Sequence, residues 1–211
     1  MPKLVPIVEG DGEVTAVPVL LYKLLRELQR YDIQVAPPKC AHGRDNLRKP
    51  DGLERFVRYA WKEPDCGAIL ILLDAEDDCP LTLVADFVPR INALGVLHPV
   101  VIVCANRMYE TWFLASYAAL AGQMGLRTDE PPAEAEAVKN PKDWLNQRFP
   151  KGRAYKERTD QEALTRLLIP TLAAVHSRSF RRLTHAVGQA IEAIDTNTKL
   201  VTPDFSSSPT S

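Results

Sequence analysis

Three short runs of apolar residues stand out in the first half of the chain, at positions 4–8, 68–73 and 100–105. None of them alternates with polar residues, as a strand with one solvated face would. Continuous apolar runs of this length are typical of strands that are covered on both faces, as in a mostly parallel sheet. A weaker run at residues 33–35 predicts one further strand.

Apolar residues recur at helical spacing between and after these runs. The pattern predicts helices over residues 17–28, 53–61 and 81–94, the last interrupted or bent near Pro89, and a longer helix over residues 180–194. Strands that alternate with helices imply right-handed crossovers. The fold class predicted is therefore α/β, an open, mostly parallel sheet with flanking helices and a helical C-terminal extension.

The rhythm changes after the third strand, which suggests how the chain is divided. Residues 1–116 form the predicted α/β core. Residues 117–158, with Pro131, Pro132 and a Lys/Arg-rich stretch, are expected to form an irregular basic insertion or lid. Residues 159–195 are expected to form C-terminal helices that pack on the core. Residues 196–211 are rich in Ser, Thr and Pro and are expected to form a disordered tail.

Composition narrows the class of protein. The 211 residues are 45% hydrophobic and 25% charged, as in a soluble globular domain. There is no apolar run long enough to span a membrane and no signal peptide pattern at the start, so a cytoplasmic location is expected. The four cysteines lack CxxC spacing and are expected to be reduced thiols. Cys40 and His42 are close in sequence, but two potential ligands alone favour a surface loop over a zinc site.

The near-neutral charge of the chain hides two halves of opposite sign. Residues 1–138 carry 14 basic and 20 acidic side chains, a formal charge of −6, whereas residues 139–191 carry 11 basic and 4 acidic ones, a charge of +7. A basic segment attracts the phosphates of nucleic acid. Alternatively, this basic segment forms only a solvated face or a surface that docks a partner. The candidate nucleic-acid-binding residues are Lys142, Lys151, Arg153, Lys156, Arg178, Arg181 and Arg182.

Acidic residues cluster where the apolar strands end. The first strand leads into Glu9 and Glu13, the second into Asp74, Glu76 and Asp78, and Glu110 follows the third. In a parallel sheet the carboxyl ends of the strands share one edge, which is where ligands bind. Converging carboxylates repel one another unless a cation compensates, and hard oxygen ligands suit Mg²⁺ or Mn²⁺. The alternative for any one cluster, and for Asp78 in particular, is a group that only solvates a loop.

These segments also resemble a known group of proteins. The VEGDGE segment, the strand that ends in DAEDD and the later ANRMYETWFLAS, KDWL and RSFRRL segments look like the Toprim domain. More closely, they resemble a Toprim-like bacterial family of unknown function related to the nucleases of the overcoming-lysogenization-defect type. The resemblance covers approximately residues 3–195.

The resemblance implies roles for individual residues. Glu9 would be the first-strand glutamate, Asp74 and Glu76 would take the DxD positions, and Glu13 would match a second glutamate of the nuclease branch. Glu110 would be a further ligand, and Lys156 would supply charge for the phosphate. The triplet here is Asp-Ala-Glu, so its second carboxylate is one methylene longer than in the family pattern. The resemblance also implies a role in bacterial defence or mobile elements and an ATPase partner of the ABC/SMC-like class.

Together these observations predict a metal-dependent nuclease that hydrolyses phosphodiesters with bound Mg²⁺ or Mn²⁺, in which Glu9 and Asp74 are the catalytic residues. The predicted partners are nucleic acid, DNA or RNA, and the ATPase, with no membrane. Two alternatives remain open at this point. One is a catalytically inactive regulatory or docking subunit of an ATPase complex, and the other is a small-molecule phosphohydrolase with an aspartate nucleophile.

Overall fold

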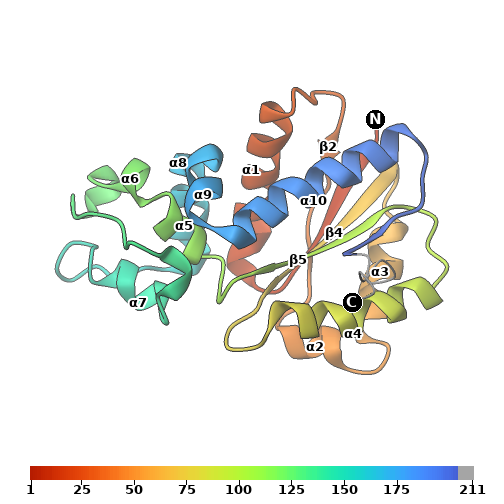
Figure 1. Ribbon diagram of the computed structural model, residues 1–211, viewed down its shortest axis with the longest axis horizontal. Coiled ribbons are helices and arrows are strands. Elements are labelled where there is room, and N and C mark those ends of the chain that lie inside the picture. Colours follow the sequence, from red (N-terminus) through yellow and green to blue (C-terminus); the bar gives the residue numbers. More distant parts are fainter. Residues whose placement is uncertain (204–211) are drawn as a thin grey trace, which may run out of the picture.

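The computed structural model describes residues 1–203, which fold around one parallel β-sheet (Figure 1). The sheet has the order β2-β1-β4-β5-β6, with β3 also paired to β1, and every strand pair is parallel. The prediction of an open parallel α/β sheet is thus confirmed. The strands are β1 (Lys3–Val8), β2 (Gln34–Val35), β3 (Lys39–Cys40), β4 (Cys66–Asp74), β5 (Val100–Ala105) and β6 (Val201–Thr202).

Helices cover both faces of the sheet, which explains why the strand sequences do not alternate. Leu70 and Leu72 of β4 join a core cluster with α1 (Asp11–Glu27) and α10 (Arg178–Asp195). Ile69 and Ile71, which alternate with these leucines along the strand, face the opposite cluster. That cluster is closed by the helices α2 (Arg44–Arg48), α3 (Gly52–Trp61) and α4 (Pro80–Ala93), which lie below the sheet in Figure 1.

The helix starts differ from those expected, because the N-terminal turns carry few apolar residues. Helix α1 begins at Asp11, directly after the loop that follows β1, and not near residue 17. Helix α10 begins at Arg178, where the hydroxyl of Ser177 accepts a hydrogen bond from the backbone N–H of Phe180 (3.0 Å). Helix α4 runs without interruption through Pro89.

The segment after β5 forms a helical lobe at the left of Figure 1. The sequence predicts an irregular insertion or lid over residues 117–158, and the structure agrees with this prediction only in part. Leu120, Leu145 and Phe149 are buried in the same core cluster as α1 and α10, so the segment shares the main core. The lobe contains α5 (Thr111–Ala115), α6 (Tyr117–Leu120), α7 (Pro141–Asn146), a π-helical turn (Glu157–Gln161), α8 (Glu162–Leu167), α9 (Pro170–His176) and two 3₁₀ turns (Gln123–Gly125 and Ala135–Ala137).

Gly12 allows the lobe to approach the core closely. A Cβ atom at this position would overlap the side-chain oxygen of Gln161 and lie 3.2 Å from the carbonyl carbon of Glu157. The π-helical turn therefore packs directly on the first turn of α1. The missing side chain at Gly12 thus serves the contact between two parts of the protein.

The predicted disordered tail over residues 196–211 is wrong for its first part. Val201 and Thr202 form β6, whose backbone pairs with Val100 and Val101 at the edge of β5. A two-residue strand is too short to leave a periodic signal in a Ser/Thr-rich sequence. The remainder of the predicted tail, residues 204–211, lies outside the described residues. Within residues 1–203, no helix has both the length and the apolar character needed to cross a bilayer.

Candidate functional site

Four carboxylates converge at the carboxyl edge of the sheet. Glu9 follows β1 directly, Asp74 is the last residue of β4, Glu13 lies in the first turn of α1, and Glu110 immediately precedes α5. The parallel topology places the ends of β1 and β4 side by side. We call these four residues, Glu9, Glu13, Asp74 and Glu110, the carboxylate pocket.

Backbone hydrogen bonds hold Glu9 and Asp74 in place. The N–H of Asp74 donates to Oε2 of Glu9 over 3.2 Å, so the side chain at the end of β1 reaches across to β4. Oδ1 of Asp74 in turn accepts a hydrogen bond from the N–H of Tyr109 (2.8 Å). The two catalytic candidates are thus neighbours, and their positions are fixed by the main chain of adjacent segments.

Glu13 has a structural contact as well as a place in the pocket. Its side chain is 5% exposed, and its Oε2 accepts hydrogen bonds from the N–H groups of Glu9 (2.9 Å) and Gly10 (2.8 Å). This is the reach-back of an N3 glutamate to the start of its helix. Glu13 therefore stabilises the loop that carries Glu9.

Glu110 connects the pocket to the helical lobe. It is 1% exposed, and its Oε1 accepts a hydrogen bond from the hydroxyl of Tyr155 (2.8 Å). Lys142, at the start of α7, forms an ion pair with Glu157 (2.5 Å) and lies close enough to Glu110 and Asp74 to interact with both charges. One cation of the lobe thus offsets part of the negative charge of the pocket.

Burial and mutual repulsion shift the protonation of the whole pocket. Burial, together with the charges of Glu9 and Glu110, raises the pKa of Glu13 to about 8. The pKa of Asp74 is raised well above its ordinary value by burial and by the charges of Glu13, Glu110 and Glu9. Burial also raises the pKa values of Glu9 and Glu110. Such a group of carboxylates takes up either protons or a cation.

The second acidic candidates after β4 point elsewhere. Glu76, expected at the second DxD position, is exposed and forms an ion pair with Arg44 (2.9 Å), and its backbone φ is +51°. Asp78 is also exposed and lies 3.3 Å from Arg44 and 3.7 Å from Arg48. Arg44 additionally donates to the backbone carbonyls of Asp74 and Ala75, 3.0 Å each. These contacts fix the turn after β4 and draw both carboxylates toward the arginine.

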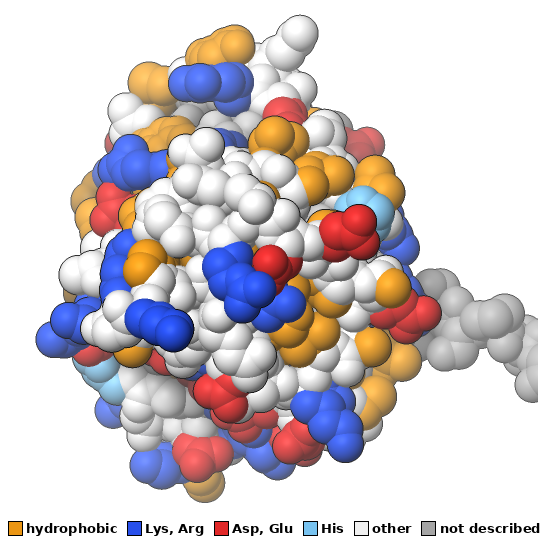
Figure 2. All heavy atoms as spheres, turned by 90° about the vertical axis from the view of Figure 1, so that its left-hand side faces the viewer, with side chains coloured by type: hydrophobic (Ala, Val, Ile, Leu, Met, Phe, Trp, Pro, Cys, Tyr) orange, Lys and Arg blue, Asp and Glu red, His pale blue; other side chains and the backbone are white. Residues whose placement is uncertain are grey.

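Several of the basic candidates have internal partners. Arg153 donates to the carbonyl of Met124 (2.8 Å) and pairs with Asp160 (2.7 Å), and Arg181 donates to the carbonyls of Ala174 (2.7 Å) and Val175 (3.2 Å) at the end of α9. Lysines and arginines are mixed with acidic side chains over the lobe end of the molecule, so this face is not uniformly basic (Figure 2). The number of basic residues in this part of the sequence is therefore larger than the number of unpaired cations at this surface would suggest.

Of the other basic candidates, Lys142 is half-buried and the rest are exposed, and most of them line two cavities. Lys142 and Lys156 line a cavity of about 450 Å³ beside Tyr155, the hydrogen-bond partner of Glu110. Arg178 and Arg182 line a second cavity, about 550 Å³, between α4 and α10. Lys151 is exposed in the loop after α7. The aromatic residues of the lobe are mainly core: Trp112 is fully buried and its indole N–H donates to the hydroxyl of Ser179 (3.0 Å).

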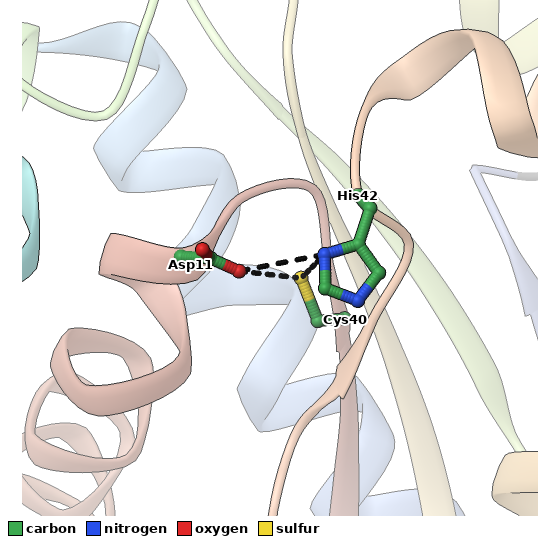
Figure 3. A group of neighbouring side chains, drawn as sticks. All are labelled: Asp11, Cys40 and His42. Carbon is green, nitrogen blue, oxygen red and sulfur yellow. Dashed lines mark hydrogen bonds and ion pairs between the residues drawn. The ribbon is translucent and has the colours of Figure 1, made fainter.

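Several residues of this region could not be identified from the amino-acid pattern. Arg44 follows β3, a two-residue strand without periodicity, and Tyr155 lies in a loop. For Cys40 and His42 the sequence favours a surface loop over a metal site, and it does not indicate Asp11 as a third partner. In the structure Asp11 joins Cys40 and His42, and their three ligand atoms lie within 4.8 Å of one another (Figure 3). In residues 1–203 this is the one group of three or more Asp, Glu, His or Cys residues that meets this distance. The carboxylate pocket does not, so it offers a cation fewer than three direct ligands in this arrangement.

Comparison with known proteins identifies a family, but the description of that family names no activity. The family model described as "Domain of unknown function (DUF4276)" matches residues 8–188, which includes the whole carboxylate pocket. No curated protein and no solved structure matches the chain.

Proposed function

This chain belongs to the DUF4276 family of unknown function, and we propose that it is a metal-dependent phosphodiester hydrolase acting on nucleic acid. The observation that carries the proposal is the carboxylate pocket at the carboxyl edge of a parallel sheet, the place where such folds bind ligands. The resemblance of the VEGDGE and DAEDD segments to Toprim nucleases supports the same chemistry.

The donor set of the pocket fits Mg²⁺ better than it fits a softer metal. All four groups are carboxylates, and neither histidine nor cysteine contributes. Mg²⁺ usually takes one or two protein carboxylates and completes its octahedron with water and substrate phosphate. Glu9 and Asp74, linked by the hydrogen bond between them, would hold the ion, and the ion would supply Lewis-acid stabilisation of the phosphate and an activated water.

Other residues in and beside the pocket hold these carboxylates in position and offset their negative charge. Glu13 holds the backbone of Glu9, and Tyr155 orients the carboxylate of Glu110. Burial lowers the pKa of Lys142, but the charges of Glu110, Glu157 and Asp74 raise it above its ordinary value, so this amine stays protonated beside the pocket. A protonated amine in this place can accept a negatively charged phosphate as it approaches.

Two basic clusters flank the pocket and would hold the substrate backbone. Lys142, Lys156 and Arg158 line the cavity next to Tyr155, and Arg178 and Arg182 line the one next to the end of β5. Contacts of this type bind phosphates without reading sequence. The predicted ATPase partner and the role in defence belong to the proposal through the sequence resemblance alone.

The direct test is a cleavage assay on labelled single- and double-stranded DNA and RNA with Mg²⁺, Mn²⁺ or EDTA. We expect cleavage that needs the metal and falls by about 100-fold or more in Asp74→Asn and in Glu9→Gln. The matched control is Asp65→Asn, an exposed aspartate that precedes β4 at the opposite end of the same strand. The asparagine at position 74 can still accept the hydrogen bond from Tyr109, so its melting temperature should equal or exceed that of the wild type.

The ion pair between Glu76 and Arg44 favours a second candidate, a docking subunit that has lost catalysis, because it removes one expected ligand from the pocket. Nucleic-acid binding that persists in EDTA and in Glu9→Gln, without cleavage of any substrate, would support that candidate and contradict the hydrolase. Release of phosphate from a small ester, with intact nucleic acid, would instead indicate a phosphohydrolase.

A further inference from the structure

A second group of ligand atoms meets beside the loop that follows β1. Asp11 is the first residue of α1, Cys40 is the last residue of β3, and His42 lies two residues later. Figure 3 shows the three side chains pointing toward one another from these two segments. The site is separate from the carboxylate pocket, since it shares none of its four residues.

The distances between the three ligand atoms match one face of a tetrahedral metal site. His42 Nδ1 lies 3.4 Å from Asp11 Oδ1 and 3.5 Å from Cys40 Sγ, and Cys40 Sγ lies 3.8 Å from Asp11 Oδ1. With zinc–ligand bonds of about 2.0–2.3 Å, the edges of a tetrahedron are about 3.3–3.8 Å long. A single ion can therefore contact all three atoms with little movement of the side chains.

Backbone contacts hold the ligand-bearing loop firmly. The N–H of Ala41 donates to the carbonyl of Val8 (2.8 Å), and the N–H of Gly43 donates to the carbonyl of Glu9 (2.9 Å). The side-chain amide of Asn46 donates to the carbonyls of Ala41 and His42, 2.9 Å each. The backbone on both sides of His42 is thus anchored to β1 and to Glu9, so the segment that carries Cys40 and His42 is held beside Asp11.

The surroundings favour a cation and leave it accessible. The Asp11 carboxylate lies 3.8 Å from the Cys40 thiol, and its negative charge attracts a cation to this place. The second oxygen of Asp11 is held by Arg158 (2.7 Å), so the first one is free to point at Cys40 and His42. The side chains of His42 and Asp11 are 72% and 44% exposed, which leaves the fourth position open to water or to another ligand.

We propose that Asp11, Cys40 and His42 form a binding site for Zn²⁺ with an open fourth position. A thiolate, an imidazole and a carboxylate are the ligand types that zinc accepts together, whereas Mg²⁺ takes oxygen ligands. The two sites of this protein thus differ in metal preference because they differ in donor atoms. Three protein ligands and one exchangeable position are the arrangement found in sites that bind a further small ligand.

The test uses Co²⁺ as a spectroscopic stand-in for zinc, added to the full chain after treatment with EDTA. We expect one equivalent of Co²⁺ to give a thiolate-to-cobalt charge-transfer band that one equivalent of Zn²⁺ removes. The band should be absent in Cys40→Ser, and Co²⁺ affinity should fall at least about 10-fold in His42→Ala. Cys79→Ser is the matched control, since Cys79 is the other cysteine of the described chain that is not buried.

Circular dichroism and melting temperature establish that each variant is folded. A charge-transfer band that survives in Cys40→Ser, or that disappears equally in Cys79→Ser, would overturn the proposal, as would the absence of any band in the folded wild type. The result is independent of the proposed hydrolase, because Mg²⁺ binding to Glu9 and Asp74 involves none of these three residues.

Discussion

At the scale of single residues, the carboxylates of the pocket differ in how far they could be predicted. Glu9 and Asp74 end two apolar strands, and a strand end can be located from sequence. Glu76 lies only two residues beyond Asp74, yet it turns to Arg44, because the backbone of the turn adopts a left-handed conformation at Glu76. The sequence indicates where Glu76 lies relative to the strand end, but its ion-pair partner, Arg44, comes from a distant segment of the chain.

The raised pKa of Glu13 predicts a pH-dependent stability. The folded protein keeps this carboxyl protonated up to a pH of about 8, while the unfolded chain ionises it near 4.5, so the unfolded state is favoured increasingly as the pH rises between these values. Each pH unit in this window costs up to about 1.4 kcal/mol of unfolding free energy. Below pH 4.5 this contribution is fully present, and it is lost as the pH passes 8.

The variant Glu13→Gln should remove this dependence. Glutamine can still accept the hydrogen bonds from Glu9 and Gly10, but it cannot ionise. Urea unfolding in EDTA should show the variant more stable than the wild type at pH 8 and close to it at pH 5. Equal stability of the two proteins at both pH values would show that Glu13 is already ionised in the folded protein.

At the scale of elements, the parallel strands and the long helices follow from the apolar pattern, whereas the short elements do not. β5 was located at its observed bounds, because both of its faces are buried. β3 and β6 contain two residues each and depend on partners far along the chain, so their own sequence carries no periodicity. The contact of Asp11 with Cys40 and His42 could not be predicted for this reason, because the pairing of β3 with β1 is what brings Cys40 to this place.

The start of α10 offers a test of its capping residue. The hydroxyl of Ser177 accepts from the N–H of Phe180 and donates to the carboxylate of Glu136 (2.7 Å). Ser177→Ala removes the cap and one hydrogen bond to a half-buried carboxylate, and we expect a loss of about 1–3 kcal/mol in urea unfolding. Thr198→Ala, an exposed hydroxyl after the same helix, should change stability by less than about 0.5 kcal/mol. Similar values for both variants would show that Ser177 does not cap the helix.

The helical lobe should unfold together with the sheet, since both share one core cluster. Leu145 of α7 is fully buried, so Leu145→Ala should cost about 2–5 kcal/mol and lower the midpoint of a single transition. Leu97→Ala is the matched control, because Leu97 is 72% exposed and should have little effect. A separate early transition of the lobe in Leu145→Ala would show that residues 117–158 act as an independent lid.

At the scale of the whole molecule, the sheet and the lobe contribute different charges to one site. The ends of β1 and β4 supply Glu9 and Asp74, while the lobe supplies Tyr155 and Lys142, which contact or neutralise the acidic groups. The opposite net charges of the two parts of the chain are therefore consistent with a site built where they meet. Composition could indicate this asymmetry, but the two parts are brought together by packing, through the shared core cluster and the close contact of the π-helical turn with Gly12.

The proposed activity depends on a divalent ion bound between the ends of β1 and β4. The most direct measurement is the anomalous diffraction of crystals soaked in Mn²⁺. If the proposed activity is correct, a peak lies within bonding distance of Glu9 and Asp74 and is absent in crystals of Asp74→Asn. Anomalous density elsewhere on the protein but none between these two carboxylates would contradict it.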